Sequence, residues 1–250
     1  MTYEYPKNFS RFYDLIYHQI RDETDSLYFQ NEAIQAKGKV LEIGVGTGRH
    51  FMNALKQGAD IYGIDISESM LNELFDKLER SEHYRVSLQN MVDFGFDFRF
   101  GLIMAPFRVL MHITDKKDQL RAINNVWEHL NKGGRFIFDT FVPDLKALIN
   151  GLHNVTDFEG EYEPGKKVRR TVSTTPDLIN QLIHVKFLIE WYENNTMMKE
   201  EWTTPMRFFF RYELEHLIER SKFRKYRIFG DYKGNELGKD SKEFVVVCQK

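Results

Sequence analysis

The sequence predicts an α/β fold: a doubly wound, mostly parallel seven-stranded sheet with a small antiparallel β insert that forms a lid. Two observations lead to this prediction. Short apolar runs alternate with amphipathic segments between residues 39 and 141, which is typical of parallel strands joined by right-handed helical crossovers. After Pro143 the pattern changes to runs with a period of two residues, which favours antiparallel strands with one covered face.

Each element of the core has its own signal. Residues 3–37 carry aromatic and apolar side chains at helical spacing, which predicts one or two helices before the sheet. Five parallel strands are predicted at residues 40–43, 61–64, 85–88, 102–105 and 135–138. The helices between them follow from apolar residues three or four apart, around Phe51, Met70 and Ile123, and the stretch 131–134 is expected to end the last of them. A helix at 212–220 and strands at 225–229 and 244–248 complete the core.

The insert is predicted to contain three antiparallel strands, at residues 169–174, 182–192 and 198–210, with turns at 175–178 and 193–196. We therefore divide the chain into a core (1–143 and 206–250, with a helical cap at 1–37) and an insert (144–205). Because the insert is too long to be a plain connection, we expect it to cover the carboxyl edge of the sheet as a lid.

Composition narrows the class of protein. The chain has 250 residues with a formal net charge of -2, so no global attraction to nucleic acid is expected. Its single cysteine, Cys248, lies in an apolar run and excludes a disulfide framework within one chain. No stretch approaches the length of a membrane span, and no signal peptide precedes the first helix. These observations predict a soluble, cytoplasmic protein without a membrane partner.

The stretch VLEIGVGTGRH, residues 40–50, is the strongest motif. A strand that runs into glycines and then a helix brings backbone N–H groups to the carboxyl edge of a sheet, where α/β proteins bind ligands. A dinucleotide loop places its third small residue one position later than Gly48, where this chain has Arg49. Glu42, two residues before Gly44, would repel a pyrophosphate but attract a cationic ligand. The loop therefore favours S-adenosylmethionine over NAD.

Two further strand ends fit a nucleoside. Asp65 follows Gly44 by 21 residues, the position from which a carboxylate accepts hydrogen bonds from ribose hydroxyls. Asn90 and Met91 end the third predicted strand and offer an amide and an apolar side chain to an adenine.

Taken together, these motifs resemble a class I S-adenosylmethionine-dependent methyltransferase, a Rossmann-like fold. The resemblance covers residues 1–145 and 206–250, and Tyr13-Asp14 with the antiparallel insert resembles the small-molecule branch that includes bacterial sugar N-methyltransferases. It implies S-adenosyl-L-methionine as the cofactor, with the glycine loop at the methionine moiety, Asp65 at the ribose and Asn90 at the adenine. The chain departs from many relatives in carrying Asn rather than Asp at position 90. The expected cofactor site comprises Tyr13, Glu42, Gly44, Gly46, Gly48, Asp65, Ile66, Asn90, Met91 and Ala105.

Three residues near the ends of strands four and five are candidates for the chemistry. His112 is a candidate base or a structural cap, Arg108 a candidate grip for a substrate anion or a surface cation, and Asp139 a candidate substrate contact or a turn cap. Methyl transfer from a sulfonium depends mainly on positioning and desolvation, so neither a nucleophile nor a metal is expected.

The sequence predicts methyl transfer to a nitrogen or oxygen of a small-molecule acceptor, by a monomer or homodimer. Two alternatives stay open. Basic clusters at 166–170 and 220–227 fit an RNA methyltransferase, although nucleic acid is not the expected partner. A non-catalytic cofactor-binding protein is the second alternative. The identity of the acceptor does not follow from the residues.

Overall fold

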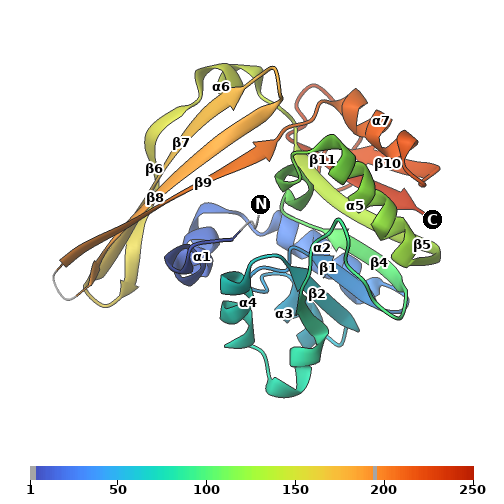
Figure 1. The fold of residues 1–250 in the computed structure, drawn as a ribbon, viewed down its shortest axis with the longest axis horizontal. Helices are drawn as coiled ribbons and strands as arrows, with labels where there is room; N and C mark the ends of the chain where they lie inside the picture. Colours follow the sequence, from blue (N-terminus) through green and yellow to red (C-terminus); the bar gives the residue numbers. More distant parts are fainter. Residues whose placement is uncertain (1–3, 194–195) are drawn as a thin grey trace.

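The computed structural model describes residues 4–193 and 196–250 and folds them into two sheets, as Figure 1 shows. The larger sheet has seven strands in the order β10-β11-β5-β4-β1-β2-β3, and β11 alone runs opposite to the other six. Its strands are β1 Val40–Ile43, β2 Ile61–Asp65, β3 Val86–Leu88, β4 Phe100–Ala105, β5 Leu130–Phe141, β10 Lys225–Phe229 and β11 Glu243–Gln249. The predicted fold class is confirmed, and all seven predicted core strands are present.

Helices cover both faces of this sheet. One hydrophobic cluster joins its strands to α5 and α7, and a second joins them to α2, α3 and α4. The helices are α1 Lys7–Ile20, α2 Thr24–Gln35, α3 Phe51–Lys56, α4 Glu68–Phe75, α5 Lys116–His129, α6 Leu145–Asn150 and α7 Arg211–Arg220, with short 3₁₀ turns η1 Arg80–Arg85 and η2 Val109–His112. Layers on both faces are what a parallel sheet requires, because its strands are apolar on both sides.

The parallel register brings the predicted ligand residues to one edge. Ile43 pairs with Ile64, Asp65 with Leu88, and Ala105 with Phe138, so β1, β2, β3, β4 and β5 pass that edge at nearly the same height. The loops that follow β1, β2, β3 and β4 therefore meet above the same edge of the sheet.

The smaller sheet has four strands rather than the three predicted. It is antiparallel in the order β6-β7-β8-β9, with β6 Leu152–Glu163, β7 Lys166–Asp177, β8 Leu182–Glu193 and β9 Thr196–Arg207. The missed strand, β6, is an edge strand in which only Phe158 is buried, so its apolar signal is weak. Helix α6 was also not predicted. The predicted turn at 175–178 is too early, because β7 continues to Asp177, and part of the turn at 193–196 lies outside the described residues.

The boundary between α5 and β5 also differs from prediction. The helix ends at His129 and β5 begins at Leu130, whereas the sequence placed a helix end at 131–134 and a strand at 135–138. Asn131 to Gly134 instead form an irregular start of β5, next to a register shift against β4. The strand also extends to Phe141, three residues past its predicted end.

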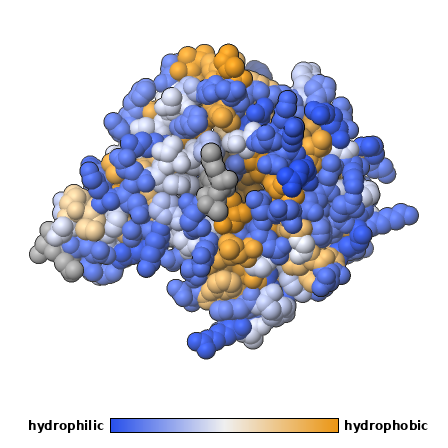
Figure 2. Space-filling view, in the orientation of Figure 1, coloured by the Kyte–Doolittle hydropathy of each residue, from blue (hydrophilic) through white to orange (hydrophobic). Residues whose placement is uncertain are grey.

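An apolar surface patch lies over α6, at the end of the insert that joins the core. Figure 2 shows it at the top of the molecule, over α6, where the side chains of Leu145 and Ile149 are 57% and 65% exposed. Within the described residues, no helix is long and apolar enough to cross a membrane.

Helix α1 packs its apolar face against the insert rather than against the core. Phe9, Phe12 and Ile16 form a third hydrophobic cluster with side chains of the small sheet, including Ile189 and Trp191. The contacts of α1 with the core include hydrogen bonds from polar side chains. Asp14 accepts hydrogen bonds from Thr47 Oγ1 (2.5 Å) and Lys77 Nζ (2.5 Å). Helix α1 and the insert therefore share one apolar core.

We expect Phe12→Ala to destabilise the protein strongly. The ring is 1% exposed and contacts Tyr162 and Trp191 with centroid distances of 5.2 and 5.6 Å. Loss of such a buried ring costs about 3–5 kcal/mol. Urea unfolding measures this change. Leu27→Ala is the matched control, because that side chain is 53% exposed on α2, and its cost should stay below about 1 kcal/mol. Similar costs for the two variants would contradict the third cluster.

Candidate functional site

One large cavity of about 830 Å³ lies above the carboxyl edge of the main sheet. Its walls come from the loops after β1, β2, β3 and β4, from helix α1, and from the inner face of the insert. Nine of the predicted site residues line it: Tyr13, Gly44, Gly46, Asp65, Ile66, Asn90, Met91, Arg108 and His112. Four do not: Glu42, Gly48, Ala105 and Asp139.

The glycine loop requires glycine for two different reasons. Gly44 has φ +72°, and a Cβ there would lie 2.3 Å from Val109 Cγ2, so the loop after β4 approaches its bare backbone. Gly48 has φ +89°, and a Cβ there would lie 2.5 Å from Leu74 Cδ1 of α4. Gly48 therefore allows the loop to pack closely against α4, and it lies behind the cavity wall.

Asp65 fixes the loop to the end of β2. Its Oδ2 accepts a hydrogen bond from Gly46 N (2.8 Å), and its Oδ1 accepts one from Ser67 N (2.9 Å). Burial raises the pKa of this carboxyl group to about 6. Each carboxylate oxygen keeps a further lone pair for a ligand hydroxyl.

Asn90 and Met91 line the same side of the cavity as Asp65. Asn90 Oδ1 accepts a hydrogen bond from Val92 N (2.9 Å), which holds the side chain in place, and Met91 is buried. An oriented amide beside an apolar side chain suits the edge and face of a heteroaromatic ring.

Helix α1 closes the cavity with aromatic rings. Tyr13 and Tyr17 lie one turn apart with centroids 4.4 Å from each other, and Tyr17 contacts Phe107 edge-on at 5.3 Å. Burial is the main cause of a raised pKa of Tyr13, so this hydroxyl stays protonated. From the insert, Phe187 and Trp202 add two further rings to the lining.

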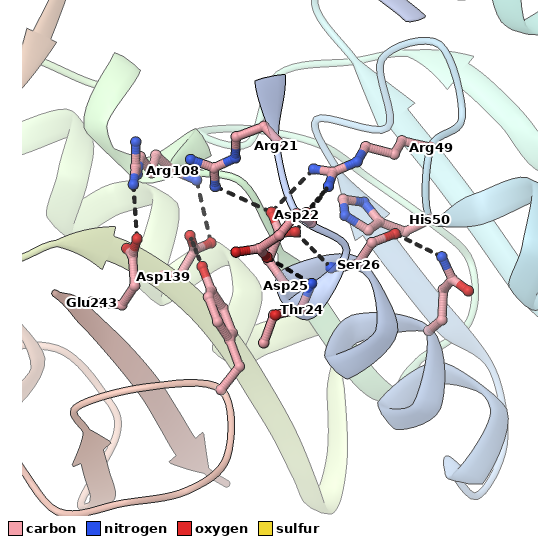
Figure 3. Close-up of polar contacts among 12 residues, drawn as sticks. Arg21, Asp22, Thr24, Asp25, Ser26, Arg49, His50, Arg108, Asp139 and Glu243 are labelled. Carbon is pink, nitrogen blue, oxygen red and sulfur yellow. Dashed lines mark hydrogen bonds and ion pairs between the residues drawn. The ribbon is translucent and has the colours of Figure 1, made fainter. Parts of the chain in front are cut away.

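A network of arginines and carboxylates forms the floor beside this aromatic wall (Figure 3). Arg49 grips Asp25 with two hydrogen bonds of 2.8 and 3.0 Å, and Arg21 contacts the same carboxylate at 3.3 Å. Both guanidinium groups also lie over the ring of Phe107, Arg21 at 4.7 Å and Arg49 at 5.4 Å from its centroid. Burial opposes ionisation of Asp25, but Arg49 and Arg21 hold its pKa below the ordinary value.

The guanidinium group of Arg108 contacts a carboxylate of the protein. Its Nη2 contacts Glu243 Oε1 at 2.9 Å, and its guanidinium lies over the ring of Phe141. Phe107 and Arg108 have φ values of 58° and 67°, a left-handed turn that is uncommon for such residues. Asp139 Oδ1 accepts a hydrogen bond from Arg108 N (3.3 Å), which supports this turn.

Asp139 lies in the protein interior, away from the cavity. Its Oδ2 accepts a hydrogen bond from Tyr232 Oη at 2.9 Å, and the residue is fully buried in β5, paired with Val245 of β11. Burial raises the pKa of its carboxyl group. Asp139 therefore supports the turn at Arg108 and does not line the cavity.

The other residues outside the lining are Glu42 and Ala105. Ala105 is fully buried in β4 within the main core. Glu42 is also fully buried, and its Oε1 contacts Nδ1 of His50 at 3.0 Å. His50 does line the cavity. Sequence reasoning missed His50, and the available signal was its place directly after the glycine loop.

His112 is the titratable group of η2 that lines the cavity. Burial lowers its pKa to about 4, so the imidazole is neutral at neutral pH. Among the described residues, no group of three or more His, Cys, Asp or Glu side chains is arranged to hold a metal ion.

Comparison with known proteins identifies similar sequences among methyltransferases. Residues 40–134 match the family described as "Methyltransferase domain". The chain is 22% identical over 223 residues to the putative methyltransferase YqeM of Bacillus subtilis, covering 87% of this chain and 86% of that protein. It is 33% identical over 135 residues to an uncharacterized methyltransferase of Bacillus cytotoxicus, covering 50% of this chain and 62% of the relative. This second match spans less than two thirds of that relative's length.

Solved structures share the whole fold. An S-adenosylmethionine-dependent methyltransferase from Clostridium acetobutylicum superposes with a TM-score of 0.76 at 19% identity, covering 97% of each chain. The sugar N-methyltransferase KedS8 from a Streptoalloteichus species gives a TM-score of 0.76 at 16% identity, covering 95% of this chain and 93% of its own. These similarities show that the insert belongs to a fold found in other methyltransferases.

We expect His112 to stay neutral down to about pH 4. Its pKa in the folded protein lies below the ordinary value of 6.5, so the unfolded chain takes up the proton first as the pH falls. Folding stability attributable to this group is therefore present above pH 6.5 and is lost as the pH falls towards 4, by at most about 1.4 kcal/mol per pH unit.

Two measurements check this expectation. NMR titration of the His112 imidazole should show no transition near pH 6.5. Urea unfolding of His112→Gln should lose less stability than the wild type between pH 6.5 and 4. A titration near 6.5 would show that the imidazole is not desolvated.

Proposed function

We propose that this chain, which is a class I S-adenosylmethionine-dependent methyltransferase, transfers the methyl group to a nitrogen or oxygen of a small-molecule acceptor. The observation that carries the proposal is the single cavity shared by two kinds of wall. The glycine loop, Asp65 and Asn90 line one part, and the inner face of the insert lines another. A cavity of this form brings a cofactor and a small acceptor together away from bulk water.

The residues present fit the cofactor. Gly44 and Gly46 offer backbone without side chains, Asp65 offers carboxylate lone pairs for ribose hydroxyls, and Asn90 and Met91 suit an adenine. When bound, the cofactor supplies an activated methyl group on a sulfonium. The chain's own task is then to orient the acceptor, exclude water and accommodate the proton that a nitrogen or oxygen loses. His112 lines the cavity as a neutral imidazole, the form that accepts a proton.

The charges of the wall favour a small acceptor over a nucleic acid. No lysine lines the cavity in the part of the chain that the structure describes, and the four lining arginines all contact carboxylates. In the basic clusters, Lys166 pairs with Glu163 and Lys222 contacts Glu128. Unpaired lysines and arginines bind an RNA backbone by neutralising its phosphates, which releases the counterions of the RNA. The paired arginines of the cavity wall therefore speak against the RNA alternative.

The solved neighbours favour nitrogen over oxygen as the methylated atom. The rings of Tyr17, Phe107, Phe187 and Trp202 line the cavity, and arginines of the protein already lie over three of them, so the rings offer the acceptor an apolar packing surface. The neighbours include proteins titled as sugar N-methyltransferase and glycopeptide N-methyltransferase. We therefore place an amine first among the acceptors, and the insert as the unit that selects it.

A methylation screen tests the proposed function. The protein is incubated with S-adenosylmethionine labelled on its methyl group and with amino sugars, other small amines, their hydroxyl analogues, or bulk tRNA. We expect label on a small amine and none on tRNA. Label on tRNA, with binding that weakens steeply as salt rises, would establish the RNA alternative. Cofactor binding without methylation of any acceptor, and unchanged by His112→Ala, would favour a non-catalytic role.

We expect Asp65→Ala to weaken S-adenosylmethionine binding about 10-fold to 100-fold, because charge-assisted hydrogen bonds to the ribose are lost. Isothermal calorimetry measures the change, with exposed Asp93→Ala, outside the cavity lining, as the matched control. Wild-type affinity should also fall as the pH drops below about 6, where Asp65 becomes protonated. Unchanged affinity in the variant would mean that the ribose lies elsewhere.

A further inference from the structure

The insert contributes one ion pair to an otherwise uncharged part of the cavity wall. Among the described insert residues that line the cavity, only Asp157 and Arg170 carry charged side chains. Arg170 donates hydrogen bonds from Nε to Asp157 Oδ1 (3.0 Å) and from Nη2 to Asp157 Oδ2 (2.7 Å). The Asp157 side chain is 28% exposed and that of Arg170 only 5%. The carboxylate is therefore the member of the pair that is more accessible to a ligand.

A β-bulge brings Asp157 to the inner face of the insert. Successive side chains of a regular strand point to opposite faces of the sheet. Phe158 packs with side chains of α1 in the third hydrophobic cluster, so a regular strand would direct its neighbour Asp157 to the outer face. The register of β6 against β7 instead shifts between Thr156 and Phe158, where two steps along β6 match one step along β7. Bulges of this kind redirect side chains next to binding sites.

Arg170 fixes the carboxylate and cancels its charge. The guanidinium lies over the rings of Tyr17 and Phe187, 4.9 and 5.0 Å from their centroids, and its two hydrogen bonds to Asp157 use one lone pair on each oxygen. Each oxygen keeps a further lone pair for a ligand. Because the pair has no net charge and both rings already face a cation, an uncharged donor such as a hydroxyl group fits this position better than a second cation.

We infer that Asp157 accepts a hydrogen bond from a hydroxyl group of the methyl acceptor and so determines specificity for hydroxylated amines. This inference rests on the proposed function, because it assumes that a small amine occupies the cavity. Asp157 binds a part of the acceptor other than the methylated nitrogen, so its contribution is to hold and orient the acceptor. Arg170 acts through Asp157 and is a positioning residue.

Two variants and one control separate this role from a structural one. The double variant Asp157→Leu/Arg170→Met replaces the ion pair by apolar side chains, a change that folded proteins often tolerate. Asp157→Asn is the milder variant, because its amide keeps one accepting oxygen but loses the charge. Glu190→Gln is the matched control. Glu190 pairs with Arg169 across the same two strands as an equivalent ion pair, and neither residue lines the cavity.

Steady-state methylation compares two acceptors: the amino sugar that the wild type methylates best, and cyclohexylamine, which keeps the ring and the amine but has no hydroxyl group. In the double variant, kcat/KM for the amino sugar should fall about 10-fold to 100-fold, mainly through KM, as expected for a lost hydrogen bond to a charged group. The value for cyclohexylamine should stay within about twofold, because that acceptor makes no such bond. Asp157→Asn should give a smaller loss of the same selectivity, and Glu190→Gln none. Calorimetry with S-adenosylhomocysteine reports whether each variant keeps its fold.

Other outcomes would overturn the inference. Equal losses for both acceptors, with S-adenosylhomocysteine still bound, would mean that Asp157 binds the amine itself. Weaker binding of S-adenosylhomocysteine in both variants would indicate a structural role for the pair. Unchanged selectivity in the double variant would show that the acceptor does not contact Asp157. Each result is distinct from failure of the proposed function, in which the wild-type protein itself methylates no small amine and the inference falls with it.

Discussion

The ion pair between Asp25 and Arg49 connects the parts of the molecule that form the site. Asp25 belongs to α2, and Arg49 directly follows the glycine loop, so the two-point grip holds the helical cap against the loop. Arg21 joins the same carboxylate, and both guanidinium groups cover Phe107 of the turn after β4. A buried carboxylate is tolerated only with such partners. Cap, loop and turn are therefore positioned by one cluster of charged groups, and this is the structural role of Arg49 in the motif.

Much of the fold follows from apolar patterning alone. The seven core strands were predictable because each is a short apolar run between amphipathic segments, as in β1 and β4. The edge strand β6 was not, because most of its residues are exposed and only Phe158 is buried. The sequence also did not predict that α1 packs on the insert. A helical stripe such as Phe9, Phe12 and Ile16 shows which face is buried but not which partner buries it.

In the candidate site, the sequence predicts where residues lie along the chain but not where their side chains point. Sequence spacing places Gly44, Asp65 and Asn90 at strand ends, and these residues line the cavity. Spacing does not give side-chain direction or the true end of a strand. Asp139 was expected at the edge because β5 was predicted to end at Phe138, but the strand continues to Phe141 and encloses the carboxylate. Its contacts with Arg108 and Tyr232 join residues far apart in the chain, which no local pattern reveals.

The shared apolar core of α1 and the insert limits which segments can be exchanged between this protein and its relatives. The cavity wall formed by α1 and the insert is assembled from two segments separated by more than a hundred residues, the first in α1 and the second after β5. A chimaera that exchanges only residues 144–205 would set a foreign sheet against Phe9, Phe12 and Ile16. The unit that can be exchanged is the insert together with its own N-terminal helix, and substitutions in the two segments are expected to covary.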